Sequence, residues 1–182
     1  MLFLDLAKSR RSVRAYTDKN IERKDLELCV EAARHAPSAC NAQPWSFVII
    51  DDPEKRDLVA RAAAYGPGNL NSFTRDARAF IAIVSEKQKF AAWIGGKLRN
   101  IDFRDTDIGI ACAHLVLQAQ ELGIGSCILG WFNERKIKKI LRVPRFKKIE
   151  LVITLGYPAE TELPEKNLKQ RNDVIKYNSY KL

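Results

Sequence analysis

The sequence predicts a single layered domain of the α/β or α+β class. Four short apolar segments have the length of buried strands, and helical segments alternate with them along the chain. A length of 182 residues with 46% hydrophobic content is enough for one core and leaves little room for two unrelated domains. We therefore expect one domain spanning residues 1–182.

The first half of the chain predicts helices alternating with strands. Residues 22–36 carry apolar side chains at helical spacing with charges on the opposite side, and Pro37 ends this helix. The apolar run 46–50 predicts a buried strand and 79–84 a second one, with a helix at 53–64 that has proline in its first turn.

The second half adds two helices and two strands. Residues 105–123 predict a helix that is nearly apolar all round, which is typical of a central or interface helix. A strand at 126–129, a basic amphipathic helix at 134–141 and a strand at 149–155 follow. From Pro158 onwards no helix or strand is predicted, so we expect this tail to pack against another surface, such as another subunit.

The net charge of +9 favours an anionic partner: nucleic acid, a membrane surface or a phosphate-bearing cofactor. Charge alone does not choose among them. No apolar run of membrane-spanning length appears, and the N-terminus is charged where a signal peptide needs an apolar stretch, so we expect a cytoplasmic protein.

The cysteines give no sign of a metal centre or a disulfide framework. Cys29, Cys40, Cys112 and Cys127 form no C-x-x-C pair and have no spacing that builds a metal site with the two histidines. We expect free thiols and no metal.

A cluster of arginines follows a short N-terminal helix expected at about residues 2–8. Arg10, Arg11, Ser12 and Arg14 combine guanidinium groups with a hydroxyl, which suits a phosphate. Each charge-assisted bond contributes about 1.5–3 kcal/mol when partly desolvated. A solvated basic surface explains the arginines alone equally well.

The stretch "PSACNAQPWSF" at 37–47 places several hydrogen-bonding groups just before a strand. Ser38, Asn41 and Gln43 favour a structural role, because such side chains usually satisfy loop backbone. The alternative is that the amides bind the edge of a heterocycle, since each presents a donor and an acceptor.

Glycines in "LGIGSCILGW" do not form a dinucleotide fingerprint. Gly123 and Gly125 follow a helix and open a strand, the reverse of the order that a phosphate-binding loop needs. Gly130, at the far end of the strand, would let backbone approach a flat ligand closely.

Two further basic regions have ordinary explanations. The run from Lys136 to Lys148 favours a solvated helix face, because its helix has a normal apolar side and only Phe146 interrupts the charges. Lys169 and Arg171 lie in the tail, where charges are usually solvated.

Taken together, the motifs resemble the nitroreductase family, FMN-dependent flavoproteins that draw electrons from NADH or NADPH. The matching pieces occur in the same order and spacing over nearly the whole chain: "RRSVRAYTDKNI", "EAARHAPSACNAQPWSFVII", the D-x-G-x-A of Asp107, Gly109 and Ala111, "LGIGSCILGW", and "LVITLGYPAE" followed by Lys169 and Arg171.

The resemblance implies an α+β, nitroreductase-like fold. A central, mostly antiparallel sheet of four strands would gain a C-terminal strand from a partner and be flanked by helices. Two copies would form an intertwined homodimer, with the 105–122 helix in the interface. The resemblance implies neither a nucleic-acid nor a membrane partner.

The same resemblance implies FMN bound at the dimer interface. Arg10, Ser12, Lys169 and Arg171 would bind its phosphate and ribityl chain, Arg11 and Arg14 would lie near N1 and the C2 oxygen, and Leu129 and Gly130 would contact the ring near N5. Pro37, Ser38, Ala39 and Asn41 of the partner would line the flavin, braced by Gln43 and Trp45. Family members also contact the ring with an Asn before the second strand, for which the 65–76 loop offers Asn69 and Asn71.

The implied function is ping-pong electron transfer from NADH or NADPH through the flavin N5 to nitroaromatics, quinones or similar small acceptors. The flavin does the redox chemistry, so no catalytic side chain is expected. Alternatives are a specialised relative that dehalogenates or consumes flavin, a flavin-binding module without turnover, and a basic nucleic-acid-binding protein.

Overall fold

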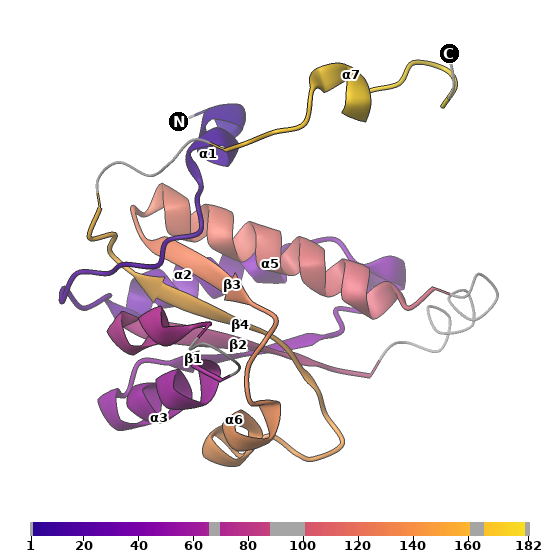
Figure 1. The fold of residues 1–182 in the computed structure, drawn as a ribbon. Helices are drawn as coiled ribbons and strands as arrows, with labels where there is room; N and C mark the ends of the chain where they lie inside the picture. The colour runs from indigo at the N-terminus through magenta and orange to yellow at the C-terminus, as the bar shows by residue number, and fades with distance from the viewer. Residues whose placement is uncertain (1, 66–69, 88–100, 161–165, 181–182) are drawn as a thin grey trace.

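One antiparallel sheet organises the molecule. The computed structural model describes residues 2–65, 70–87, 101–160 and 166–180. In Figure 1 the sheet runs through the centre in the order β1-β2-β4-β3, and each neighbouring pair is antiparallel. The strands are β1 (Trp45–Ile50), β2 (Ala79–Ser85), β3 (Gly125–Leu129) and β4 (Ile149–Gly156). The four predicted strands and the antiparallel sheet are confirmed.

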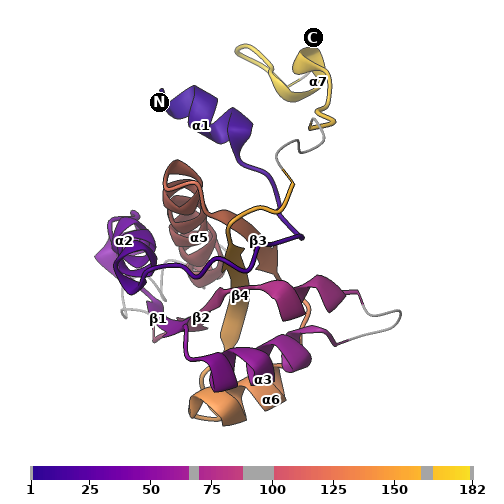
Figure 2. The same ribbon diagram turned by 90° about the vertical axis from the view of Figure 1, so that its left-hand side faces the viewer.

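Helices cover both faces of this sheet. Figure 2 shows α2 (Arg23–Arg34) and α5 (Phe103–Glu121) together on one face, with α3 (Pro53–Ala63) and α6 (Glu134–Leu141) on the other. The predicted helices therefore form, with ends shifted by one or two residues, which is the usual uncertainty at helix termini.

The central strand β2 separates two hydrophobic cores. Side chains alternate across a strand, so Ile81 and Ile83 pack with α2 and α5, while Phe80 and Val84 pack with α3 and α6. All seven residues of β2 are buried, which explains why its sequence is a continuous apolar run.

The N-terminal segment packs along the β3 edge of the sheet. Ser12 bridges Ser126 in parallel, and the Val13 amide donates to the Ser126 carbonyl at 3.0 Å. Farther on, the Thr17 amide donates to the Tyr157 carbonyl at 2.9 Å. Residues 12–17 are thereby tied both to β3 and to the chain that leaves β4.

Two glycines make this close approach possible. A Cβ on Gly125 would lie 2.7 Å from Val13 Cγ2, and a Cβ on Gly156 would lie 2.6 Å from Tyr16 Cδ1. Real side chains do not approach this closely, so both positions need glycine. Val13 is 2% exposed and Tyr16 8%, so each is an anchor of the N-terminal segment.

The two ends of the chain lie apart from the sheet. Helix α1 (Phe3–Ser9) has no buried residue, and residues 166–180 are all exposed. The expectation of a tail without any element is corrected by one short helix, α7 (Arg171–Val174), drawn near α1 in Figures 1 and 2. Four residues carry too little apolar periodicity to signal a helix in sequence.

Short 3-10 helices lie in the loops that precede β1 and β2. The first, η1 (Ala39–Asn41), lies just before β1, and the second, η3 (Ser72–Asp76), lies in the polar 65–76 loop. The four cysteines, all among the described residues, form no disulfide.

Replacing Gly156 by Ala should lower the free energy of unfolding by about 1–3 kcal/mol, because the new methyl group collides with the ring of Tyr16. Urea unfolding followed by circular dichroism measures the change. Gly109→Ala is the matched control, since a Cβ there meets nothing within 4 Å and alanine favours the helix by up to about 1 kcal/mol. Equal stability of Gly156→Ala and wild type would contradict the close packing.

Candidate functional site

Three of the predicted phosphate-binding residues gather around one thiol at the β3 edge. Arg10, Ser12 and Arg14 all act on Cys127 of β3. Burial raises the pKa of the Cys127 thiol, while the charges of Arg14 and Arg10 and a hydrogen bond with Ser12 offset part of that rise. The segment that carries two guanidinium groups and a hydroxyl therefore lies along β3, where Ser12 bridges Ser126, and such groups are the donors that bind a phosphate.

A buried hydrogen-bond network holds this segment in place. The Tyr16 hydroxyl donates to the Val13 carbonyl at 2.7 Å and shares a hydrogen bond with the Thr154 hydroxyl at 2.7 Å. Thr154 in turn donates to the Cys127 carbonyl at 3.3 Å. Burial raises the pKa of Tyr16 well above its usual range, so the phenol stays protonated. The arginines therefore project from a fixed backbone.

Arg11 and Lys166 close the end of α1. The Arg11 guanidinium donates to the carbonyls of Lys8 and Arg10, and Lys166 Nζ donates to the Ala7 carbonyl at 2.8 Å. Desolvation and the nearby charges of Arg10 and Arg11 lower the pKa of Lys166. Sequence reasoning missed Lys166, because only the return of the tail to α1 places this lysine beside the arginines.

Lys169 and Arg171 lie farther along the same tail and are exposed. Within the described part of the chain, no hydrogen bond or ion pair joins either of them to Arg10, Ser12 or Arg14. The structure of one chain therefore brings the tail back to the arginines through Lys166, and the roles expected of Lys169 and Arg171 stay predictions.

The 3-10 helix η3 lies beside the arginine segment. The Arg14 guanidinium stands over the Phe73 ring, 5.9 Å from its centroid. The buried amide of Asn71 donates to the carbonyls of Ala63 at 3.2 Å and of Trp131 at 2.8 Å. Asn71 thereby braces the turn after Gly130, whereas Asn69 lies outside the described residues.

The backbone at the end of β3 is open to a ligand. Leu129 is buried, but a Cβ on Gly130 would meet nothing within 4 Å, and Trp131 is 59% exposed. A flat molecule can therefore approach the Gly130 backbone without steric hindrance.

The loop before β1 is held by a buried carboxylate. The Ala39 amide donates to both oxygens of Asp107, at 3.1 and 3.2 Å. Asp107 is 4% exposed, and desolvation raises the pKa of its carboxyl, an effect that the Ala39 hydrogen bond partly offsets. Sequence reasoning identified Asp107 only as a family motif. The available signal is that Asp107 directly precedes the most apolar part of this helix, where a carboxylate needs a hydrogen-bond donor.

Hydrogen bonds within the loop hold an unusual backbone. Ser38 Oγ accepts from the Gln43 amide at 2.9 Å, and the Gln43 side chain donates to Asn41 Oδ1 at 3.0 Å. Cys40, Asn41 and Gln43 all have positive φ angles, of 53°, 49° and 48°. Such conformations cost about 1–3 kcal/mol each and cluster at functional sites. Trp45, 8% exposed, anchors the loop in the core, consistent with bracing by Gln43 and Trp45.

The loop and the arginine segment lie at opposite edges of the sheet. The loop leads into β1, and the arginines lie along β3, with β2 and β4 between these strands. At about 4.8 Å per strand spacing, the two edges are about 14 Å apart. The loop and the arginine segment also lie near different ends of α5. The loop is attached at Asp107, near the start of the helix, whereas a cavity of about 450 Å³ beside Arg11 and Val13 is lined by Gln120, near its end.

The arginine segment suits a dianionic ligand group, and the open backbone at Gly130 suits a flat ring. Arg10 and Ser12 supply donors that suit a phosphate, and Gly130, just after β3, leaves room for a ring. One chain supplies these two parts, but its own loop of residues 37–44 lies too far away to cover them.

The described residues also limit other kinds of site. They include no group of three or more His, Cys, Asp or Glu side chains placed to hold a metal ion. None of the helices in the described ranges has the length and apolar character needed to cross a membrane.

Comparisons with known proteins agree on one family. A family model described as "Nitroreductase family" matches residues 7–157. A protein from Archaeoglobus fulgidus, named for NADH dehydrogenase/NAD(P)H nitroreductase activity, is 30% identical over 178 residues, covering 93% of this chain and 91% of its own. An iodotyrosine deiodinase from Thermotoga neapolitana is 23% identical, with coverage of 98% and 99%. The solved FMN-dependent nitroreductase from Clostridium difficile is 27% identical, covers 98% of this chain and 100% of its own, and has a TM-score of 0.78.

Asp107→Ala should destabilise the protein by about 1–3 kcal/mol, because the Ala39 amide loses its acceptor. Asp107→Asn keeps an oxygen acceptor and should be neutral or stabilising at pH 7. The folded-state pKa of Asp107 is raised, so its contribution to stability is greatest when it is protonated and declines as the pH rises through that pKa.

The Asn variant should consequently gain stability relative to wild type as the pH rises from about 4 to 7. Urea unfolding across this pH range measures both variants. An Asn variant as unstable as the Ala variant at pH 7 would show that the negative charge itself is required.

Proposed function

The chain belongs to the nitroreductase family, and on that premise we propose that it is an FMN-dependent oxidoreductase. It draws electrons from NADH or NADPH and reduces nitroaromatics, quinones or similar conjugated acceptors by a ping-pong mechanism. One observation carries the proposal: the segment that bears Arg10, Ser12 and Arg14 lies along β3, and Gly130, just after that strand, leaves open backbone.

This arrangement assigns a role to each part of the site. Arg10 and Ser12 hold the phosphate, with Lys166 close enough to add positive charge, and Lys169 and Arg171 complete the phosphate and ribityl contacts. Arg11 and Arg14 place positive charge near the pyrimidine side of the ring, and Leu129 and Gly130 lie against its centre. When bound, FMN supplies the hydride and electron chemistry, and the protein orients it and tunes its charge.

The active form is a homodimer with FMN at the interface. The separation of the loop from the arginines within one chain supports this, because a second copy can place its Pro37, Ser38, Ala39 and Asn41 over the ring. Leu2, just before α1, and Phe3 and Leu4 in its first turn are more than half exposed, and such an apolar surface is typical of an interface. β1 pairs only with β2 among the described strands, so its outer edge can accept a strand from the partner.

A second candidate is reductive dehalogenation at the same site. It is favoured by the similarity to an iodotyrosine deiodinase over nearly the full length of both chains. The two functions share the FMN site and differ in the acceptor, so release of iodide from iodotyrosine distinguishes dehalogenation from reduction of a nitroaromatic.

The proposed function predicts a yellow protein that bleaches under anaerobic conditions when NADH or NADPH is added. Addition of a quinone or nitroaromatic should restore the colour, and absorbance near the flavin maximum follows both steps. A yellow protein that stays coloured with both nicotinamides would indicate a binding module without turnover. A colourless protein that cannot be reconstituted with FMN would refute the proposal.

The shared site predicts complementation between two inactive variants. Arg10→Ala should weaken FMN binding by about 1.5–3 kcal/mol, and Asn41→Ala should lower occupancy through loss of the covering loop. In a mixed dimer, one site carries both changes and the other carries neither, so activity should return on mixing. Arg61→Ala, an exposed arginine on α3, is the matched control. No recovery on mixing would indicate that each chain builds its own site.

A further inference from the structure

Most of the net charge of the protein lies in one short segment away from the proposed flavin site. Residues 134–148 contain eight Lys or Arg and one acidic residue, in a chain whose formal net charge is +9. None of these residues belongs to the phosphate-binding cluster. The segment comprises α6 and the turn that leads into β4.

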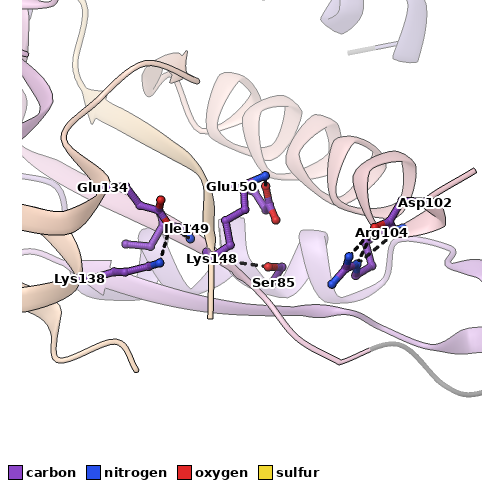
Figure 3. Close-up of polar contacts among 8 residues, drawn as sticks. All are labelled: Ser85, Asp102, Arg104, Glu134, Lys138, Lys148, Ile149 and Glu150. Carbon is purple, nitrogen blue, oxygen red and sulfur yellow. Dashed lines mark hydrogen bonds and ion pairs between the residues drawn. The ribbon is translucent and has the colours of Figure 1, made fainter. Parts of the chain in front are cut away.

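The acidic groups near this segment already have partners. Glu134 pairs with Lys138 at 2.7 Å and accepts from the Ile149 amide at 3.0 Å, and Lys148 pairs with Glu150 at 2.5 Å (Figure 3). Lys147 pairs with Glu86. Five exposed cations have no ion pair in the described part of the chain: Arg135, Lys136, Lys139, Arg142 and Arg145.

Four of these five cations line a groove. The groove has a volume of about 760 Å³ and lies between α6 and the 142–145 turn, with Val143 and Pro144 as its apolar part. Arg142 has a φ angle of 56°, and the Val143 amide donates to the Lys138 carbonyl at 2.9 Å, so the chain turns back beside the helix. The backbone thereby directs arginines from both sides toward the same hollow.

The geometry argues against two common anionic partners. The apolar side of α6, with Ile137 fully buried, packs in the core, so this helix has no free apolar face to insert into a membrane. Among the residues that the structure describes, no aromatic ring lines the groove, and Phe146, 81% exposed, lines a separate cavity with Lys147 and Lys148. Nucleic-acid bases therefore find no stacking platform in the groove.

Planar carboxylates are the anions that fit best. Arginine binds a carboxylate with two parallel hydrogen bonds, and three arginines line the groove beside its small apolar part. We propose that this groove docks an acidic, extended segment of a partner protein. The surface is independent of the flavin site, so it serves to recruit or anchor the enzyme.

A substitution at Arg142 can remove a positive charge and keep the backbone conformation of the turn. Glycine adopts a positive φ without strain, so Arg142→Gly removes a cation without disturbing the turn. The groove variant Arg142→Gly/Arg145→Gln is compared with Arg61→Gln/Arg75→Gln, which removes two exposed cations that line a different cavity. Both variants lower the net charge equally.

The test uses the full-length protein and a fluorescein-labelled oligoglutamate peptide, with binding followed by fluorescence anisotropy. The groove variant should bind about tenfold more weakly than wild type, and the control variant less than about threefold more weakly. The thermal unfolding midpoint and flavin content of the groove variant should match those of wild type.

Three outcomes would overturn the proposal. Equal losses in the groove and control variants would show that only net charge matters. Tighter groove-dependent binding of a single-stranded oligothymidine than of the peptide would assign the surface to nucleic acid. Groove-dependent sedimentation with phosphatidylserine vesicles, without peptide binding, would assign it to a membrane.

Discussion

The close packing of Val13 and Tyr16 against two glycines is the contact on which the candidate site depends. Gly125 and Gly156 leave no space for a side chain, so the N-terminal segment can lie directly on the sheet. The Tyr16 hydroxyl then ties that segment to Val13 and Thr154. The backbone that carries Arg10, Ser12 and Arg14 is therefore held against the β3 edge, so in the proposed site it would need no ordering when a ligand binds.

The sheet order underlies the proposal of a site shared between two copies. The arginine segment lies at the β3 edge, whereas the strained loop enters at β1, with β2 and β4 between them. Asp107 holds the loop to α5 by accepting from Ala39, so the loop cannot cross the sheet to reach the arginines. In the proposed homodimer, the loop of a second copy covers the flavin ring that the first copy holds.

Two basic regions of the protein have different physical settings. Around Arg10, positive charge is partly desolvated and lies over a buried thiol, where a phosphate would gain strong electrostatic stabilisation. Around Arg142, positive charge is exposed to water and lines an open groove, where a flexible acidic chain gains more from many weak contacts than from one strong one. Both regions are rich in positive charge, so composition does not distinguish them. They differ in their structural surroundings.

By itself, the sequence predicted the four strands and the helices that flank them, because apolar periodicity is a local property of the chain. The order of its motifs indicated the family, and the antiparallel α+β fold followed from that resemblance. The sequence also identified Arg10, Ser12 and Arg14, since their spacing is short. Only the tertiary structure placed Lys166 beside those arginines, gave Asp107 its role on Ala39 and separated the loop from the arginines. These features join residues that are distant in sequence, and no local pattern encodes which distant atoms will meet when the sheet folds.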